Sequence, residues 1–195
     1  MTGAPPDWAE ALLRVFLTPA DFDSVSGDLL EQYRDSVRPA RGESAADAWY
    51  VLQVLGFVWR RARIWAVLVA AAFVTRTALD WLEPPVDFHT RATVSTFLGI
   101  GLLLCAGLWA SMRSGSFVAG TLAGVAATAL GAVISITGAA GLLALWHDAG
   151  TMAAISASGG LGEVFALPLM MVVPGALLGT IGGLVGATIR QLRST

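Results

Sequence analysis

The stretch ATVSTFLGIGLLLCAGLWASM, residues 92–112, decides the fold class of this chain. It contains no charged side chain, and Arg91 and Arg113 lie directly on either side of it. A helix needs about 20 apolar residues to cross the hydrocarbon core of a bilayer, which is about 30 Å thick. Residues 92–112 therefore predict a transmembrane helix. The composition agrees, since 55% of the 195 residues are hydrophobic.

Three further apolar stretches predict three further spans. They are residues 64–82, 116–146 and 164–189. The first of these is the weakest, because it contains Arg76 and Asp80. The second is longer than one span requires, so it must tilt, bend or end early, and Pro168 and Pro174 can kink the third. We expect an all-α integral membrane protein with four transmembrane helices, and the sequence leaves open whether the loop 147–163 re-enters the membrane.

The residues before the first span differ in composition and predict a water-soluble helical module. Residues 1–59 hold nine acidic residues and four arginines. They lack the basic start and the apolar core of a signal peptide. Capping signals at Asp7, at Thr18-Pro19 and at Ser44 predict three helices. Residues 38–44 predict the loop that precedes the third of them.

Each predicted helix of this module shows an apolar stripe that a small core could bury. The stripes are Trp8, Leu12, Val15 and Phe16; Phe22, Val25, Leu29 and Tyr33; and Trp49, Leu52 and Gly56 or Trp59. Residues three or four apart lie on the same face of a helix. We therefore expect a helical hairpin or bundle over residues 1–59, followed by a transmembrane domain over residues 60–195.

The placement of arginine predicts the orientation of the spans. Arginines lie before the first span, between the second and third, and after the fourth: Arg60, Arg61, Arg63, Arg113, Arg190 and Arg193. The other two loops hold only Arg91, together with Glu83, Asp87, Asp148 and Glu163. Because basic residues are retained on the cytoplasmic side, we expect a multi-pass protein of the inner (cytoplasmic) membrane with both termini in the cytoplasm.

Arg76 and Asp80 form a candidate site, because they are ionisable residues inside a predicted span. They are four residues apart, so they share one face of a helix and can form an ion pair. Charged residues at such positions often carry function, and they also occur as neutralised structural pairs. The sequence leaves both interpretations open: a structural pair near the outer interface, or a polar seam that faces the bundle or a partner helix.

Glycines recur at intervals of four residues in the third and fourth spans. They are Gly120 and Gly124 in the third, and Gly175, Gly179 and Gly183 in the fourth. Small residues at this spacing let two helices approach closely. We expect these glycines to pack the third span against the fourth rather than to form a dimer face.

The sequence offers little for catalysis or metal binding. It has neither an HExxH nor a GxxxxGK[ST] motif, and its single cysteine, Cys105, lies in an apolar run. His89 and His147 fall in separate loops, without the regular spacing of metal ligands. The acidic N-terminal segment argues against nucleic-acid binding. We therefore expect no enzyme activity, no catalytic residue, no cofactor and no metal site.

Three blocks of the N-terminal segment resemble a known module. LLRVFL (residues 12–17), SGDLLEQYRD (26–35) and AADAWYVLQVL (45–55) resemble, in this order, the permease prefix domain, which precedes the first membrane helix of many bacterial FtsX-type ABC transporter permeases of the macrolide-exporter class. The matching residues are Leu12, Leu13, Arg14, Phe16, Leu17, Gly27, Asp28, Leu29, Glu31, Tyr33, Arg34, Trp49, Tyr50, Gln53 and Val54.

The resemblance covers residues 8–60 only, and the membrane part departs from it. Those permeases carry a large extracytoplasmic domain between their first two spans, where this chain has only Glu83–Arg91. The resemblance therefore implies a cytoplasmic module of transporter-associated proteins, without implying that this chain transports a substrate.

These features together predict a small accessory or regulatory subunit of a membrane complex, and the resemblance implies that this complex is associated with an ABC transporter. It would contact membrane lipids and another membrane or cytoplasmic protein, and not nucleic acid. The residues expected to dock the partner are Asp28, Leu29, Glu31, Tyr33, Trp49 and Tyr50. Two other functions stay open: a self-contained transporter or channel for small molecules or lipids, built as a homo-oligomer, and a membrane-tethered sensor that holds a cytoplasmic regulator.

Overall fold

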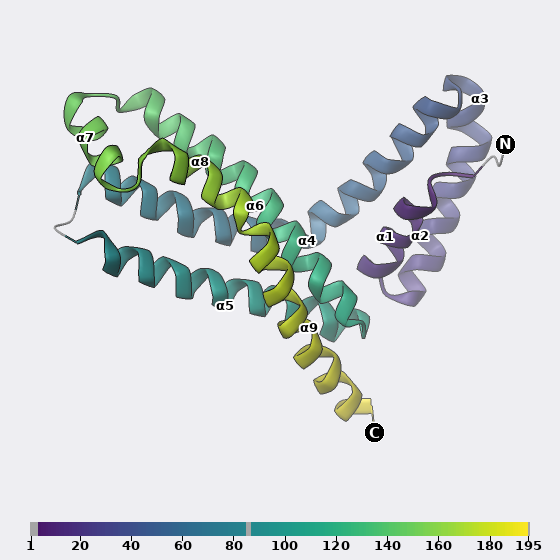
Figure 1. Ribbon diagram of the computed structural model, residues 1–195. Helices are drawn as coiled ribbons and strands as arrows, with labels where there is room; N and C mark the ends of the chain where they lie inside the picture. Colours follow the sequence, from purple (N-terminus) through teal and green to yellow (C-terminus); the bar gives the residue numbers. More distant parts are fainter. Residues whose placement is uncertain (1–3, 85–86, 195) are drawn as a thin grey trace.

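The computed structural model describes residues 4–84 and 87–194, and within these residues the chain is helical and contains no strand (Figure 1). In chain order the helices are α1 (Asp7–Phe16), α2 (Pro19–Gln32), the π-helical turn η1 (Tyr33–Val37), α3 (Arg38–Arg41), α4 (Glu43–Leu82), α5 (Phe88–Ser114), α6 (Phe117–Leu145), α7 (Ala149–Ala157), α8 (Gly160–Met170) and α9 (Val172–Ser194). The prediction of an all-α protein is confirmed for these residues.

Among the described residues, four helical segments are long and apolar enough to cross a membrane, which confirms the predicted number of candidate spans. The first three are α4, α5 and α6, and the fourth is formed by α8 and α9 together, over Gly160–Arg193. The helix that contains the first predicted span begins at Glu43, so residues 59 and 60 lie inside one continuous helix. The module and the bundle are therefore joined by helical backbone and not by a loop.

The prediction of a loop over residues 38–44 is wrong. Helix continues from α2 through η1 and α3 to Arg41, and only Gly42 interrupts it, with φ 81°. Pro39 lies at the second residue of α3, directly after the π-helical turn η1. The left-handed conformation at Gly42 suits a residue without a side chain, and it reverses the chain into α4.

The predicted helix starts have mixed outcomes. The Thr18 hydroxyl accepts a hydrogen bond from the Asp21 amide at 3.3 Å, so the cap at Thr18 is confirmed. The predictions of caps at Asp7 and Ser44 are wrong. Pro6 and Gly42 precede α1 and α4 respectively, and neither helix start has a side-chain cap.

The loop predicted over residues 147–163 contains a short helix, α7. Asp148 caps it by accepting hydrogen bonds from the amides of Gly150 and Thr151 at 3.0 and 3.1 Å, and from the Thr151 hydroxyl at 2.8 Å. These hydrogen bonds, that of the hydroxyl first, lower the pKa of Asp148. Helix α8 then begins at Gly160, four residues before the predicted span.

The fourth candidate span is interrupted at Met171, between α8 and α9. Pro174 has no N–H to bond the carbonyl four residues earlier, at Met170. The predicted kink in this span therefore occurs about one turn before Pro174. Pro168 lies inside α8, which continues past it.

The chain has separate hydrophobic cores in its N-terminal module and in its bundle. The module core comprises Ala9, Leu13, Leu17, Leu29, Tyr33, Ala46, Tyr50 and Val54. In the bundle, Val69, Leu103 and Ala127 form one cluster, and Trp81, Ala139 and Ile155 form another. Helix α9 packs against α5 and α6, and α6 packs against α4. Figure 1 shows the N-terminal module and α7 at opposite ends of the molecule.

Candidate functional site

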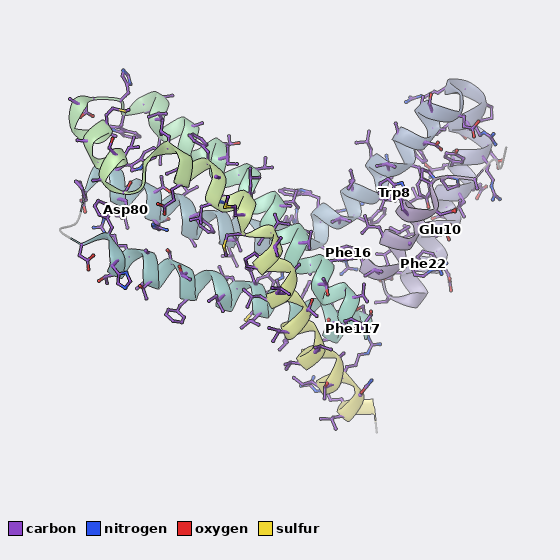
Figure 2. All side chains as sticks on the ribbon, in the orientation of Figure 1. Trp8, Glu10, Phe16, Phe22, Asp80 and Phe117 are labelled. Carbon is purple, nitrogen blue, oxygen red and sulfur yellow. The ribbon has the colours of Figure 1, made fainter. Side chains whose placement is uncertain are left out.

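Arg76 and Asp80 are brought together on α4, as their spacing suggests. The Arg76 Nε atom donates a hydrogen bond to Asp80 Oδ2 at 3.3 Å. The Asp80 side chain is only 4% exposed, and that of Arg76 is 16% exposed. Figure 2 places Asp80 at the end of the bundle that is remote from the N-terminal module. A carboxylate buried to this degree requires charged or polar partners.

Two further residues complete this cluster, and sequence reasoning missed both. Arg76 Nη2 lies 3.4 Å from Glu163 Oε1 of α8, and Arg91 Nη1 of α5 lies 3.6 Å from Asp80 Oδ1. Arg91 also donates hydrogen bonds to the carbonyl oxygens of Leu79 and Glu83, at 2.8 and 2.9 Å. These carbonyls belong to the end of α4, where a cation is favourable. No sequence spacing signals these contacts, because they depend on the tertiary packing.

The four-residue cluster is a neutral clamp that joins α4, α5 and α8. Two arginines face two carboxylates, so the formal charges cancel. Beside it lies a cavity of about 30 Å³, which is large enough for about one water molecule and too small for a larger solute. The arrangement is therefore suited to holding three helices together.

The glycines predicted to pack the third and fourth spans lie at the contact between α6 and α9. A Cβ atom on Gly179 would lie 2.5 Å from the carbonyl oxygen of Gly120, and one on Gly183 would lie 3.1 Å from the Cα of Gly120. A Cβ atom on Gly124 would overlap the carbonyl of Gly175. Backbones this close leave no room for side chains.

Helix α9 makes a second close contact of this kind, with α5. Cβ atoms on Gly182 and Gly186 would overlap the carbonyl oxygens of Leu104 and Leu108, and a Cβ atom on Gly107 would overlap that of Gly179. This contact was not among those predicted from the sequence. The one sequence feature that points to the contact with α5 is the interval of four residues between Gly182 and Gly186.

The residues expected to dock a partner divide into two groups. The side chains of Leu29, Tyr33 and Tyr50 lie inside the module core, so they cannot form a docking surface while the module is folded. The Tyr33 and Tyr50 rings meet edge to face, with centroids 6.0 Å apart. These large apolar side chains supply most of a small core. Leu29 and Tyr33 therefore take the core positions that their stripe predicts, and all three side chains are removed from the docking hypothesis.

The remaining docking candidates are at least partly accessible. Asp28 and Glu31 are exposed on α2, and with Gln32, Asp35 and Ser36 they line a shallow acidic groove. Trp49 is half-buried against the module core. The docking hypothesis therefore keeps Asp28 and Glu31 as exposed residues.

The third predicted apolar stripe is not the buried face of α4. Ala46, Tyr50 and Val54 fill the module core instead. Leu52, Leu55 and Trp59 are 66%, 46% and 41% exposed. At 3.6 residues per turn these three side chains lie along one face. We call them the α4 stripe.

We expect Tyr33→Phe to remove a pH dependence of stability. The Tyr33 hydroxyl donates a hydrogen bond of 2.6 Å to Asp47, and this bond, together with burial, raises the pKa of Tyr33 from 10.0 to about 12. A raised pKa means that the contribution to stability is complete below pH 10.0 and is lost as the pH rises to about 12. At neutral pH the substitution should cost about 1 kcal/mol.

The measurement is the unfolding free energy of wild-type and Tyr33→Phe protein in one detergent, from neutral pH to pH 12. The difference between the two proteins isolates Tyr33 from Tyr50, whose hydroxyl is also buried. If the difference in unfolding free energy between the two proteins stayed the same from neutral pH to pH 12, the role assigned to the hydrogen bond with Asp47 would be wrong.

Comparisons with protein-family models, with curated proteins and with solved structures found no match to this chain. The function must therefore be argued from its residues.

Proposed function

We propose that this protein is an accessory subunit of a membrane complex, which it binds through its N-terminal helical module. The observation that carries the proposal is the α4 stripe, a row of three large apolar side chains exposed outside the predicted spans. Exposed apolar patches of this kind often mark interaction sites. Burying one such side chain contributes about 1.5–3 kcal/mol.

The position of the stripe suits a partner at the membrane surface. It precedes Arg60, Arg61 and Arg63, which stand before the first predicted span. By the bias of arginine toward the cytoplasmic side, we place the module and both termini in the cytoplasm and the bundle in the inner membrane. The partner would then meet the α4 stripe just above the lipid headgroups.

The surroundings of the stripe define the chemistry of this partner. The module has its own core, so the stripe is not required to fold it. Helix α4 continues from the stripe into the bundle, which holds the stripe at a fixed height above the membrane. Asp28 and Glu31 add an acidic surface on α2. We infer a partner with an apolar helix face and basic residues beside it.

The resemblance to the permease prefix domain supports an ABC exporter as the complex. The resembling residues comprise both core positions, such as Tyr33 and Tyr50, and exposed ones, such as Asp28 and Glu31. An exporter permease, or its ATP-binding subunit, is therefore the partner we would test first.

A self-contained transporter has less support. Among the hydroxyl groups that could line a path through the bundle, those of Thr128, Ser135 and Thr137 donate to carbonyl oxygens within α6. The charges of the four-residue clamp are paired with one another. Polar groups satisfied in this way are of little use for binding a solute.

Photo-crosslinking in cells tests the proposed docking surface. We expect a photoreactive amino acid at Leu55 to cross-link one protein, and the same group at Gln53 not to do so. Gln53 is an exposed residue on another side of the same helix, which makes it a matched control. Equal cross-linking from both positions, or cross-linking from Leu55 to lipid alone, would contradict the proposal.

The variant Leu52→Ser/Leu55→Ser provides the complementary test. Because both side chains are exposed, their replacement should change the unfolding temperature of the isolated protein little. The amount of partner, as identified by cross-linking, that co-purifies with the variant in mild detergent should fall at least about tenfold. The reason is that two apolar contacts of about 1 kcal/mol or more are lost.

A further inference from the structure

A cavity of about 360 Å³ lies where the N-terminal module meets the bundle. The end of α1 and the start of α2 form one side, and α4, α5 and α6 form the others. Figure 2 labels Phe16, which lines the cavity, and Phe117 at the nearby start of α6. Protein interiors contain few voids larger than a water molecule, and ligand sites measure about 300–1,000 Å³. The volume therefore fits a ligand.

The wall of the cavity inside the bundle is apolar. Its alanines leave the space that larger side chains would fill, and they are Ala62, Ala106, Ala110, Ala119 and Ala123. Trp65 and Trp109 also line it, edge to face, with ring centroids 6.5 Å apart. Tryptophan favours the level at which lipid chains meet headgroups. The cavity thus offers an apolar interior at that level.

The rim of the cavity is cationic. The Arg113 guanidinium lies over the Trp109 ring, 4.2 Å from its centroid, and Arg113 makes no ion pair with a carboxylate in residues 4–84 and 87–194. Arg61 lies 3.8 Å from Asp21, which also lines the cavity and offsets one positive charge. One net positive charge remains beside the apolar volume.

We propose that this cavity binds an anionic phospholipid of the leaflet on the side of the N-terminal module. One acyl chain lies among the alanines and the two tryptophans, and the phosphate group lies beside Arg113 and Arg61. Arginine near a membrane surface attracts anionic lipid with about 1 kcal/mol per residue. The site goes beyond the docking function, because it uses the inner side of the module and not the α4 stripe.

Native mass spectrometry of the full chain in mixed micelles tests the proposal. The probes are dioleoylphosphatidylglycerol, which is anionic, and dioleoylphosphatidylcholine, which has the same chains and no net charge. We expect one molecule of the anionic lipid to bind per chain, at least about fivefold more tightly than the zwitterionic one, as one net positive charge of about 1 kcal/mol requires.

Three variants locate the binding. Arg61→Gln/Arg113→Gln should abolish the preference for the anionic lipid, whereas the control Arg63→Gln/Arg193→Gln should keep it, because neither control residue lines the cavity. Ala110→Phe should fill the cavity and weaken the binding of both lipids at least about tenfold. Elution volume and circular dichroism show whether each variant is folded. If Ala110→Phe does not fold, the lipid preference of Arg61→Gln/Arg113→Gln alone decides the test.

Equal affinity for the two lipids would overturn the proposal. So would a wild-type preference in Arg61→Gln/Arg113→Gln, or undiminished binding to folded Ala110→Phe, since the lipid would then bind elsewhere on the surface.

Discussion

We expect Gly124→Val to separate α6 from α9 and to destabilise the bundle by about 2–3 kcal/mol, the upper range for overpacking a tight contact. The reason is that a Cβ atom at Gly124 would overlap the backbone carbonyl of Gly175, with the Cα of Gly179 only 3.0 Å away. Backbone atoms cannot rotate aside as the end of a long side chain can. The helices must therefore move apart, and they lose the packing on which association in a membrane depends.

Gly141→Val in the same helix is the matched control. A Cβ atom there would have nothing within 4 Å, so the change should lie within about 0.5 kcal/mol of wild type. Unfolding of both variants in one detergent, followed by tryptophan fluorescence, gives the comparison. If Gly124→Val were as stable as Gly141→Val, the close contact of α6 with α9 would be wrong.

The membrane part of the fold could be read from the sequence because its signals are local. An uncharged apolar stretch such as residues 92–112 predicts a membrane helix whatever surrounds it. The four-residue interval of glycines likewise describes one face of one helix. It does not identify the partner helix, which is why the contact of Gly182 and Gly186 with α5 was missed.

The N-terminal module was read less well because its apolar residues outnumber its core positions. Tyr50 and the stripe residues Leu52 and Leu55 are all apolar enough to be buried, and periodicity alone allowed either face of α4 to be the inner one. The structure uses the face of Tyr50, which meets Tyr33. The same choice leaves Leu52 and Leu55 exposed, although Leu52 belongs to the stripe that the sequence predicts to be buried.

The charged cluster was half predicted for a similar reason. Arg76 and Asp80 are neighbours along one helix, so their spacing reveals the pair. Arg91 and Glu163 lie in segments that looked like ordinary outer loops, and only the packing of α5 and α8 against α4 brings them to the pair. Sequence spacing therefore described an isolated ion pair where the structure has a four-residue network.

We expect Arg76→Leu to destabilise the protein by about 3 kcal/mol, the lower end of the cost of removing one partner of a buried ion pair, because Asp80 keeps a second partner. Asp80, with a side chain only 4% exposed, would keep a single ion pair, with Arg91 at 3.6 Å. The double variant Arg76→Leu/Asp80→Leu should be more stable than this single variant. It removes one charge of each sign, and the remaining Arg91 and Glu163 side chains are 30% and 39% exposed, so water can solvate them.

A double-mutant cycle in one detergent measures this difference, with Glu83→Gln, an exposed carboxylate at the end of α4, as the control. The double variant also distinguishes a structural role of the cluster from a role in binding the partner, because the charges of the remaining Arg91 and Glu163 still balance. If it recovers stability and retains the partner cross-linked from Leu55, the cluster is a structural clamp. If it recovers stability but loses that partner, the charges themselves form part of the interface. A double variant no more stable than Arg76→Leu would show that the buried pair is not coupled as its 3.3 Å geometry requires.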